Sequence, residues 1–307
     1  MNAKMAAMLE RPVKHQSFEG VSLRRKVTNW VATVLVSMSV LVALIPLVWV
    51  LYSVVTKGYQ ALTSAEWFTN SQSGMTAFEE GGGAYHAIVG TVLQALVCAA
   101  ISIPIGVMVA VYLVEYGGTR LGKVTTFMVD ILTGVPSIVA ALFIYALWVA
   151  TLGFQRTGFA VSLSLVLLMI PVIVRSTEEM LRIVPMDLRE ASYALGIPKW
   201  KTIVRIVIPT ALSGIVTGVM LSLARVMGET APLLVLVGYA QAMNFDMFGG
   251  FMGSLPGMMY DQIGAGAGAN EVPTDRMWGA ALTLVLLIAL LNIAARVGAK
   301  IFAPKKV

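Results

Sequence analysis

The chain has very few of the side chains that usually hold metals or perform covalent catalysis. It contains one cysteine, Cys98, and two histidines, His15 and His86, which lie far apart in the sequence. A single cysteine excludes a disulfide framework and a cysteine-based zinc site, and two distant histidines provide no zinc-protease arrangement. Ser137 and Ser254 lack the local pattern of a nucleophile elbow. We therefore expect no catalysis in this chain, and we expect any energy source to lie on a partner.

One glycine-rich stretch has only the opening of a phosphate-binding loop. Residues 117–123 contain the required glycines and lysine, but Val124 occupies the position that needs serine or threonine for Mg²⁺. No strand is expected before it, because it lies in a short loop between two apolar runs. We expect no cofactor in this chain, and we expect ATP and Mg²⁺ to be bound by a partner ATPase.

Charged residues are also scarce. They make up 12% of the 307 residues, against 58% hydrophobic residues, which is too apolar for a soluble domain of this size. Several apolar runs reach the spanning length of roughly 20 residues. We predict an all-α membrane protein, a polytopic helical bundle of six transmembrane helices. The six predicted spans are residues 30–55, 86–114, 125–150, 159–174, 206–239 and 277–298.

The organisation that follows is a permease-like membrane domain, residues 30–298, between two polar tails, residues 1–29 and 299–307. The first apolar run follows a tail of about thirty residues and exceeds a signal-peptide core, so we interpret it as an uncleaved anchor. The fifth span is too long for one straight crossing. We expect it to bend or break at Gly228 and Pro232.

Lysine and arginine are distributed very unevenly between the loops. The two tails, Arg296 at the end of the last span, and the loops at residues 115–124 and 175–205 hold eighteen of them, whereas the alternate loops hold three. This bias predicts that both termini and residues 175–205 are cytosolic. Residues 56–85 and 240–276 are then external, and the second of these is expected to be flexible or re-entrant. The net charge of +6 therefore indicates membrane topology and not nucleic-acid binding.

A charged segment interrupts the apolar chain between the fourth and fifth spans. Asp187 and Glu190 have the spacing of a capping box, which predicts a helix starting near Leu188. Gly196 is suited to the left-handed residue that ends such a helix, and Pro198 to the first turn of the next. We predict a short polar helix, a tight turn and a second helix that runs into the membrane.

The same segment resembles the EAA loop of ABC-importer permeases. Glu190-Ala191-Ser192 is followed by Gly196 and by Ile206-Val207-Ile208-Pro209, with Ser192 in place of the third Ala and Ile208 in place of Leu. The resemblance implies that residues 175–209 form a loop that docks on a cytosolic ATPase. The alternative is an ordinary amphipathic hairpin. The residues implicated in coupling are Glu190, Ala191, Gly196, Pro198, Lys199 and Trp200.

Ionisable residues within or beside apolar spans are the other candidates, because charge at depth usually faces a bundle interior or a polar path. Arg225 and Glu229 have a four-residue spacing that predicts one shared helical face. Arg175 and Glu178 also share a face, where the fourth span leaves the membrane. Their alternatives are a structural ion pair and an interfacial anchor. For Asp130, early in the third span, we expect a capping or packing role.

Four stretches resemble the PstA-type permeases of bacterial phosphate importers: residues 130–139, 175–185, 194–200 and 224–232. The resemblance covers residues 86 to 298. It implies type I ABC-importer architecture, a sister permease of the PstC type, a dimer of cytosolic ATP-binding subunits, an external phosphate-binding protein and a lipid bilayer around the bundle. It also implies roles in phosphate passage or coupling for four residues, namely Arg175, Glu178, Arg225 and Glu229.

The resulting hypothesis is the permease subunit of an ATP-driven importer of inorganic phosphate. Guanidinium groups can replace water around an oxyanion, and an Arg225–Glu229 pair is expected to gate the path. A permease for another oxyanion, sulfate or molybdate, is the near alternative. A gated channel or a non-transporting sensor scaffold is an alternative of another class, which has no need of an ATPase-docking loop. An intramembrane enzyme would require a catalytic dyad.

Overall fold

The computed structural model describes residues 22–76, 79–266 and 271–302. It divides into two units, residues 1–52 and 53–307, which are described separately. The described part of the first unit is helical, and it is the beginning of helix α2 (Leu23–Thr63), which carries Pro46 in its interior. Helix therefore starts inside the predicted tail of residues 1–29, of which residues 1–21 lie outside the described part.

The second unit contains the rest of α2 and all of the other helices, and no strand occurs among the described residues. Among the described residues, five helices are long and apolar enough to cross a membrane, or six if the bent pair α5–α6 is one span. The chain is thus an all-α, polytopic membrane protein. The helices after α2 are α3 (Glu66–Thr69), α4 (Tyr85–Tyr116), α5 (Arg120–Thr133), α6 (Ser137–Ile144), α7 (Gly158–Ile183), α8 (Met186–Ala194), α9 (Lys199–Thr202), α10 (Ile208–Met227), α11 (Ala231–Leu236), α12 (Leu255–Gly266) and α13 (Glu271–Phe302).

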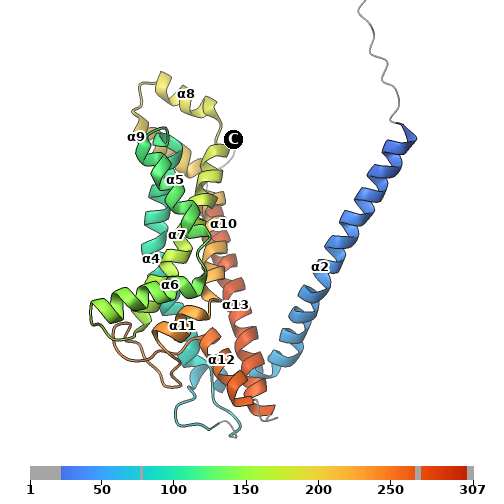
Figure 1. The fold of residues 1–307 in the computed structure, drawn as a ribbon, viewed down its shortest axis with the longest axis vertical. Helices are drawn as coiled ribbons and strands as arrows, with labels where there is room; N and C mark the ends of the chain where they lie inside the picture. Colours follow the sequence, from blue (N-terminus) through green and yellow to red (C-terminus); the bar gives the residue numbers. More distant parts are fainter. Residues whose placement is uncertain (1–21, 77–78, 267–270, 303–307) are drawn as a thin grey trace, which may run out of the picture. The chain divides into compact units, whose positions relative to one another are not determined.

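Helix α7 is the centre of this unit. Its apolar stretch is 67% buried, against at most 33% for the other membrane-length helices of the unit. Glycines let α4 and α10 approach it closely: a Cβ on Gly106 would lie 2.7 Å from Ile173, and one on Gly218 would lie 2.4 Å from the Ser176 hydroxyl. Small residues commonly permit such contacts in membranes. The resulting core consists of α4, α7 and α10, with α13 beside α10 (Figure 1).

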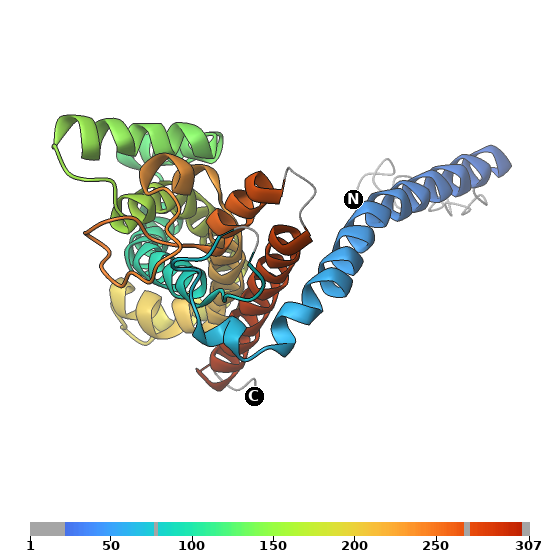
Figure 2. The ribbon, with the colours of Figure 1, turned by 90° about the horizontal axis from the view of Figure 1, so that it is seen from below.

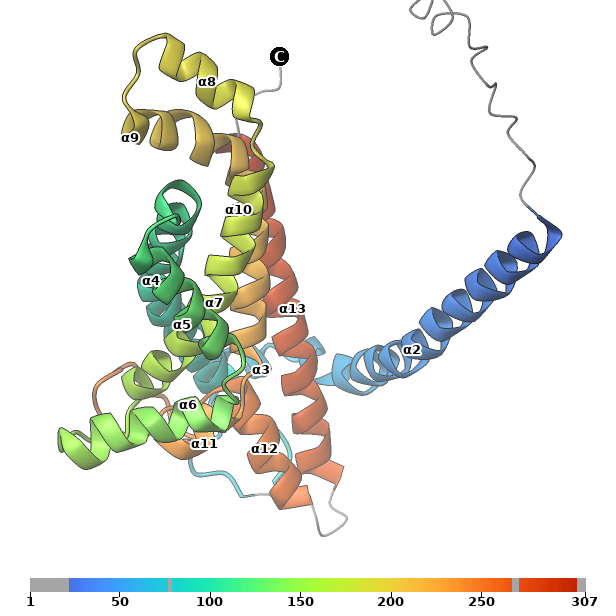
Figure 3. The same ribbon diagram turned by 45° about the horizontal axis from the view of Figure 1, so that its top comes forward.

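The predicted span 125–150 is not one continuous helix, which corrects that prediction. Helix α5 ends at Thr133, α6 begins at Ser137 and continues as a π-helical turn to Thr151, and the two axes differ by 107°. Pro136 has no N–H to donate and disfavours helix at the residue before it. Helix α6 therefore lies across the bundle, on the side away from α13 (Figures 2 and 3).

The fifth span breaks where the sequence predicts. Helix α10 ends at Met227, with the Gly228 N–H donating to the Arg225 carbonyl at 3.2 Å. Helix α11 begins only at Ala231, with Pro232 in its first turn, where the missing N–H is not needed. At the other end, α10 is continuous with α9 through a π-helical turn, residues 203–207.

The predicted external segment, residues 240–276, is partly ordered by helix α12. Leu255 and Met258 of this helix are buried, and the Leu255 N–H donates to the Thr91 hydroxyl of α4 at 2.8 Å. Helix α12 packs against α13 and α4. The glycine-rich run at residues 264–268 begins inside α12, and residues 267–270 lie outside the described part.

Candidate functional site

A cluster of four charged side chains joins α5 to α7. The Arg175 guanidinium donates to the Asp130 carboxylate of α5 and, at 2.8 Å, to the Glu178 carboxylate. The Arg182 guanidinium donates to the other Glu178 oxygen at 2.6 Å. We call these four residues the path cluster. The structure thus brings together three of the candidate residues, and it adds Arg182, which we did not predict.

The side chains of the path cluster range from buried to exposed. The exposed fraction is 9% for the Glu178 side chain, 33% for Arg175 and 57% for Asp130. Glu178 and Arg182 follow Arg175 by three and seven residues, so all three lie on one face of α7. A guanidinium carries five N–H donors, and two of those of Arg175 serve the ion pairs. Arg175 therefore retains donors for a further anion on its open side.

We expected a capping or packing role for Asp130, and capping does not occur. Asp130 lies near the C-terminal end of α5 as a partner of Arg175. The N-terminus of that helix is capped instead by Thr119, whose hydroxyl accepts from the Gly122 N–H at 3.0 Å. A contact between residues 45 positions apart depends on how α5 packs on α7, so the local pattern around Asp130 does not show it.

The predicted ion pair between Arg225 and Glu229 is wrong. Helix α10 ends at Met227, so Glu229 is not one turn further along the same helix. Within residues 22–76, 79–266 and 271–302, neither side chain has an ion-pair partner. Glu229 instead lines a cavity of about 10 Å³ with Thr91, Gln94 and Ser254, which is about the size of one water molecule.

Arg225 remains as an exposed cation on α10. Gly218 of the same helix lies against Ser176 of α7, and Arg225 follows Gly218 by seven residues. This spacing returns to nearly the same helical face about 10 Å further along the axis. Arg225 and Arg175 therefore lie at different heights of the α7–α10 pair, and both are accessible from outside this chain.

The segment predicted to contact an ATPase forms a hairpin of α8 and α9 at one end of the second unit, where α13 also ends (Figure 1). We call it the α8–α9 hairpin, residues 186–202. Helix α8 begins at Met186 after Pro185, with no side-chain cap, so the predicted capping box does not form. Asp187 lies in the first turn, where a carboxylate still interacts favourably with the helix dipole.

Gly196 has the conformation predicted for it. Its φ is +73°, its N–H donates to the Tyr193 carbonyl at 2.9 Å, and the Ile197 N–H donates to the Ser192 carbonyl at 3.2 Å. This is the Schellman arrangement. Pro198 then precedes α9 as its N-cap. A hydrogen bond of 2.7 Å between the buried hydroxyls of Ser192 and Thr202 joins the two helices.

The outer surface of the α8–α9 hairpin is accessible. Trp200 is 65% exposed and Leu195 is 79% exposed, and Glu190 and Ala191 are exposed too. Apolar side chains open to solvent in this number usually mark a protein contact. Lys199 differs, because its ammonium group donates to the Glu115 carbonyl of α4 at 2.6 Å.

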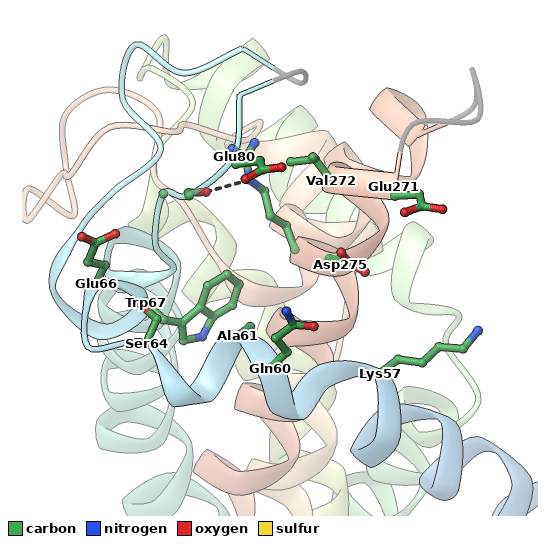
Figure 4. A pocket seen from close by; sticks show the side chains of 13 residues that line it. Lys57, Gln60, Ala61, Ser64, Glu66, Trp67, Glu80, Glu271, Val272 and Asp275 are labelled. Atoms are coloured by element: carbon green, nitrogen blue, oxygen red, sulfur yellow. Dashed lines mark hydrogen bonds between the residues drawn. The ribbon is translucent and has the colours of Figure 1, made fainter.

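A cavity of about 360 Å³ lies between the end of α2, the loop before α4 and the start of α13 (Figure 4). Four carboxylates line it, against the cations Lys57 and Arg276. The Arg276 guanidinium is bound to the carbonyls of Thr76, Glu79 and Gly81. An anion would meet an excess of negative charge here, so we do not assign oxyanion binding to it. The carboxylates are Glu66, Glu80, Glu271 and Asp275.

Solved structures show which class of protein has this fold. A bacterial alginate ABC transporter chain matches with a TM-score of 0.58 at 13% identity, over 90% of this chain and 95% of that one. A chain of the inward-facing MetNI methionine ABC transporter matches with a TM-score of 0.55 at 19% identity, over 72% and 94%. The fold is therefore that of the membrane subunits of ABC importers.

Sequence comparisons place the chain more narrowly. Residues 102–307 match the family of binding-protein-dependent transport system inner membrane components. Phosphate transport system permease protein PstA 1 of Mycobacterium tuberculosis (strain CDC 1551 / Oshkosh) is 56% identical, over 94% of this chain and 93% of that protein. PstA of Mycobacterium leprae is 58% identical over 93% of each, and PstA of Pasteurella multocida 40% over 92% and 96%. The chain belongs to this permease family, as a PstA-type, non-enzymatic transporter subunit.

Proposed function

We propose that the chain is the permease subunit of an ATP-driven importer of inorganic phosphate. It forms the translocation path together with a sister permease and receives the motion of cytosolic ATPases through the α8–α9 hairpin. ATP and Mg²⁺ are bound by those ATPases and not by this chain. The relatives named as phosphate transport permeases, at 56% and 58% identity, support the substrate assignment.

One observation supports the path above all others. Arg175 and Arg225 are accessible on helices that are otherwise apolar enough to lie in a bilayer. A central arginine costs roughly 2.5–3.5 kcal/mol on insertion scales, so such residues face a polar path or a protein partner. A second permease against α5, α7 and α10 would enclose both guanidiniums. The enclosed fork-shaped donors then replace the hydration shell of a phosphate ion.

The two ends of the bundle have different partners in this proposal. The exposed aromatic and aliphatic side chains of the α8–α9 hairpin suit an apolar cleft on an ATPase. The opposite end receives phosphate from an external binding protein. Cysteines at Trp200 and Glu66, in a chain whose buried Cys98 has been replaced, test this orientation. Only the cysteine at Glu66 should react with an impermeant reagent in sealed cells, and the reverse pattern would contradict the assignment.

Uptake of radiolabelled phosphate and sulfate by cells expressing the complete transporter tests the path. Arg225→Gln should abolish phosphate uptake, and Arg225→Lys should reduce it more than tenfold, because lysine lacks the fork. Lys123→Gln is the matched control: it removes an exposed cation in the first turn of α5, about two turns before Asp130. Wild-type uptake by Arg225→Gln at equal membrane abundance would contradict the assignment of Arg225 to the translocation path. Uptake of sulfate alone would contradict the assignment of phosphate as the substrate.

A further inference from the structure

Three residues at the inner side of the α8–α9 hairpin form a second charged cluster, which the proposed function does not use. The Arg189 guanidinium of α8 donates to the carboxylate of Glu115, in the last turn of α4. Lys199 of α9 places its ammonium group 3.6 Å from the same carboxylate. One carboxylate thus receives cations from both helices of the hairpin. We call Glu115, Arg189 and Lys199 the coupling clamp.

The coupling clamp also reaches the main chain of two membrane helices. Arg189 donates to the Leu181 carbonyl in the last turn of α7 at 3.0 Å, and Lys199 donates to the Glu115 carbonyl at 2.6 Å. The Lys199 ammonium group also lies 4.2 Å from the centre of the Tyr116 ring. Cations interact favourably with the carbonyls at helix C-termini. Both α4 and α7 are therefore fastened to the hairpin where they end.

Burial makes the Glu115–Arg189 pair unlike an ordinary surface ion pair. The side chains are 6% and 8% exposed. A buried ion pair contributes little net stability compared with apolar residues of the same volume, whereas the loss of one partner is costly. The pair gives a directed, fixed connection between α4 and α8. Along the chain, α8 follows α7 after only two residues, Val184 and Pro185.

From these contacts we propose that the coupling clamp transmits motion of the α8–α9 hairpin to α4 and α7, and that Glu115 is a positioning residue for the coupling of ATP hydrolysis to transport. This inference rests on the proposed function. The hairpin moves as one piece, because Ser192 and Thr202 join its two helices. The motion passes from α4 to α7 where Gly106 contacts Ile173. Helix α7 carries Arg175 and Glu178, so the path cluster moves with it.

The test uses the complete transporter, with its ATPases and binding protein, reconstituted in liposomes. Phosphate uptake and ATP hydrolysis are measured together and expressed as a ratio. In Glu115→Gln the ATPases should still assemble and hydrolyse ATP, while uptake per ATP hydrolysed falls at least tenfold. Arg189→Lys should keep part of the wild-type ratio, because it keeps a cation near Glu115. Lysine lacks the guanidinium fork, so it cannot also reach the Leu181 carbonyl.

Two further variants separate coupling from folding and from ATPase docking. Lys199→Gln leaves the buried Glu115–Arg189 pair intact, so it should fold even if Glu115→Gln does not, and uptake per ATP should fall two- to threefold with the bound ATPase unchanged. Arg120→Gln is the matched control, an exposed cation at the first residue of α5, and should keep the wild-type ratio.

The outcomes distinguish this proposal from the function on which it rests. If wild-type liposomes take up no phosphate, the proposed function is wrong. If wild-type liposomes transport phosphate while Lys199→Gln, and Glu115→Gln where it assembles, keep the wild-type ratio of uptake to hydrolysis, the coupling clamp has no role in coupling. Loss of the bound ATPases from Lys199→Gln would assign it to docking and would also overturn the proposal.

Discussion

The two charged clusters of the second unit contain similar side chains in opposite environments. In the path cluster, Asp130 is 57% exposed, and it holds an arginine that is itself accessible. In the coupling clamp, Glu115 and Arg189 are almost completely buried. Exposed ion pairs contribute about 0–1 kcal/mol to stability, whereas removing one partner of a buried pair lowers stability by about 3–5 kcal/mol. The first cluster can therefore exchange an anion at low cost, and the second cannot.

Within the two clusters, removal of Arg175 should have the largest effect on function. Arg175→Gln leaves Glu178, which is 9% exposed, with Arg182 alone, and removes a guanidinium from the path. Phosphate uptake should fall more than a hundredfold, with membrane abundance reduced less than threefold. Asp130→Asn removes only the exposed partner, so its uptake should stay within threefold of wild type. If Asp130→Asn abolished uptake as fully as Arg175→Gln, an exchangeable pair would be excluded.

The coupling clamp should respond in the opposite way, with a large loss of stability that a second substitution relieves. Arg189→Met leaves the Glu115 carboxylate buried beside a single, half-exposed lysine, which should destabilise the transporter by about 3–5 kcal/mol. The pair Glu115→Leu with Arg189→Met should recover most of this thermal stability but not uptake per ATP. A double variant that recovers both would show that the pair is structural only.

The turn at Gly196 should affect coupling without a loss of packing. No atom would lie within 4 Å of a Cβ at this position, and only the φ of +73° opposes a side chain. Gly196→Val should strain the turn by about 1–2 kcal/mol and lower transport-linked ATP hydrolysis severalfold at normal abundance. Gly196→Asn is the control, because asparagine adopts this conformation more readily. Equal losses in both variants would point to the exposed surface and not to the backbone.

Sequence alone predicts the features of this chain that depend on local chemistry. The left-handed turn at Gly196 and the break at Gly228 follow from the residues themselves. The pairing of Arg225 with Glu229 was wrong because the i, i+4 rule requires an unbroken helix, and Gly228 ends it. The corresponding i, i+3 rule holds for Arg175 and Glu178, which lie within α7.

Contacts between distant segments are the part that local patterns do not contain. Asp130 meets Arg175 only because α5 packs on α7, and Glu115 meets Arg189 across 74 positions. The α5–α6 bend is different, since Pro136 is a local signal for it. We did not predict that bend because the apolar run continues past the proline. Hydropathy shows that a segment is apolar, but it does not show the direction of the helix axis.

The smallest effect should come from Ser192, which stands where the resembling EAA loops have alanine. Its hydroxyl and that of Thr202 are both buried and lie 2.7 Å apart. A neutral hydrogen bond contributes about 0.5–1.5 kcal/mol. In Ser192→Ala, the Thr202 hydroxyl keeps the Pro198 carbonyl, at 3.4 Å, as an acceptor. The loss of stability should therefore lie at the lower end of this range, and phosphate uptake should stay within twofold of wild type.

Thr202→Val removes the other hydroxyl of the same hydrogen bond and should have a larger effect on stability. It removes the hydroxyl that Ser192 contacts and leaves the Ser192 side chain buried, with only its own helix to bond. Leaving a buried polar group unsatisfied costs about 1–3 kcal/mol, so Thr202→Val should lower the melting temperature of the transporter more than Ser192→Ala, with uptake per ATP unchanged in both. If uptake per ATP fell in Ser192→Ala as far as in Glu115→Gln, rigidity within the hairpin would control coupling, and the coupling clamp would be secondary.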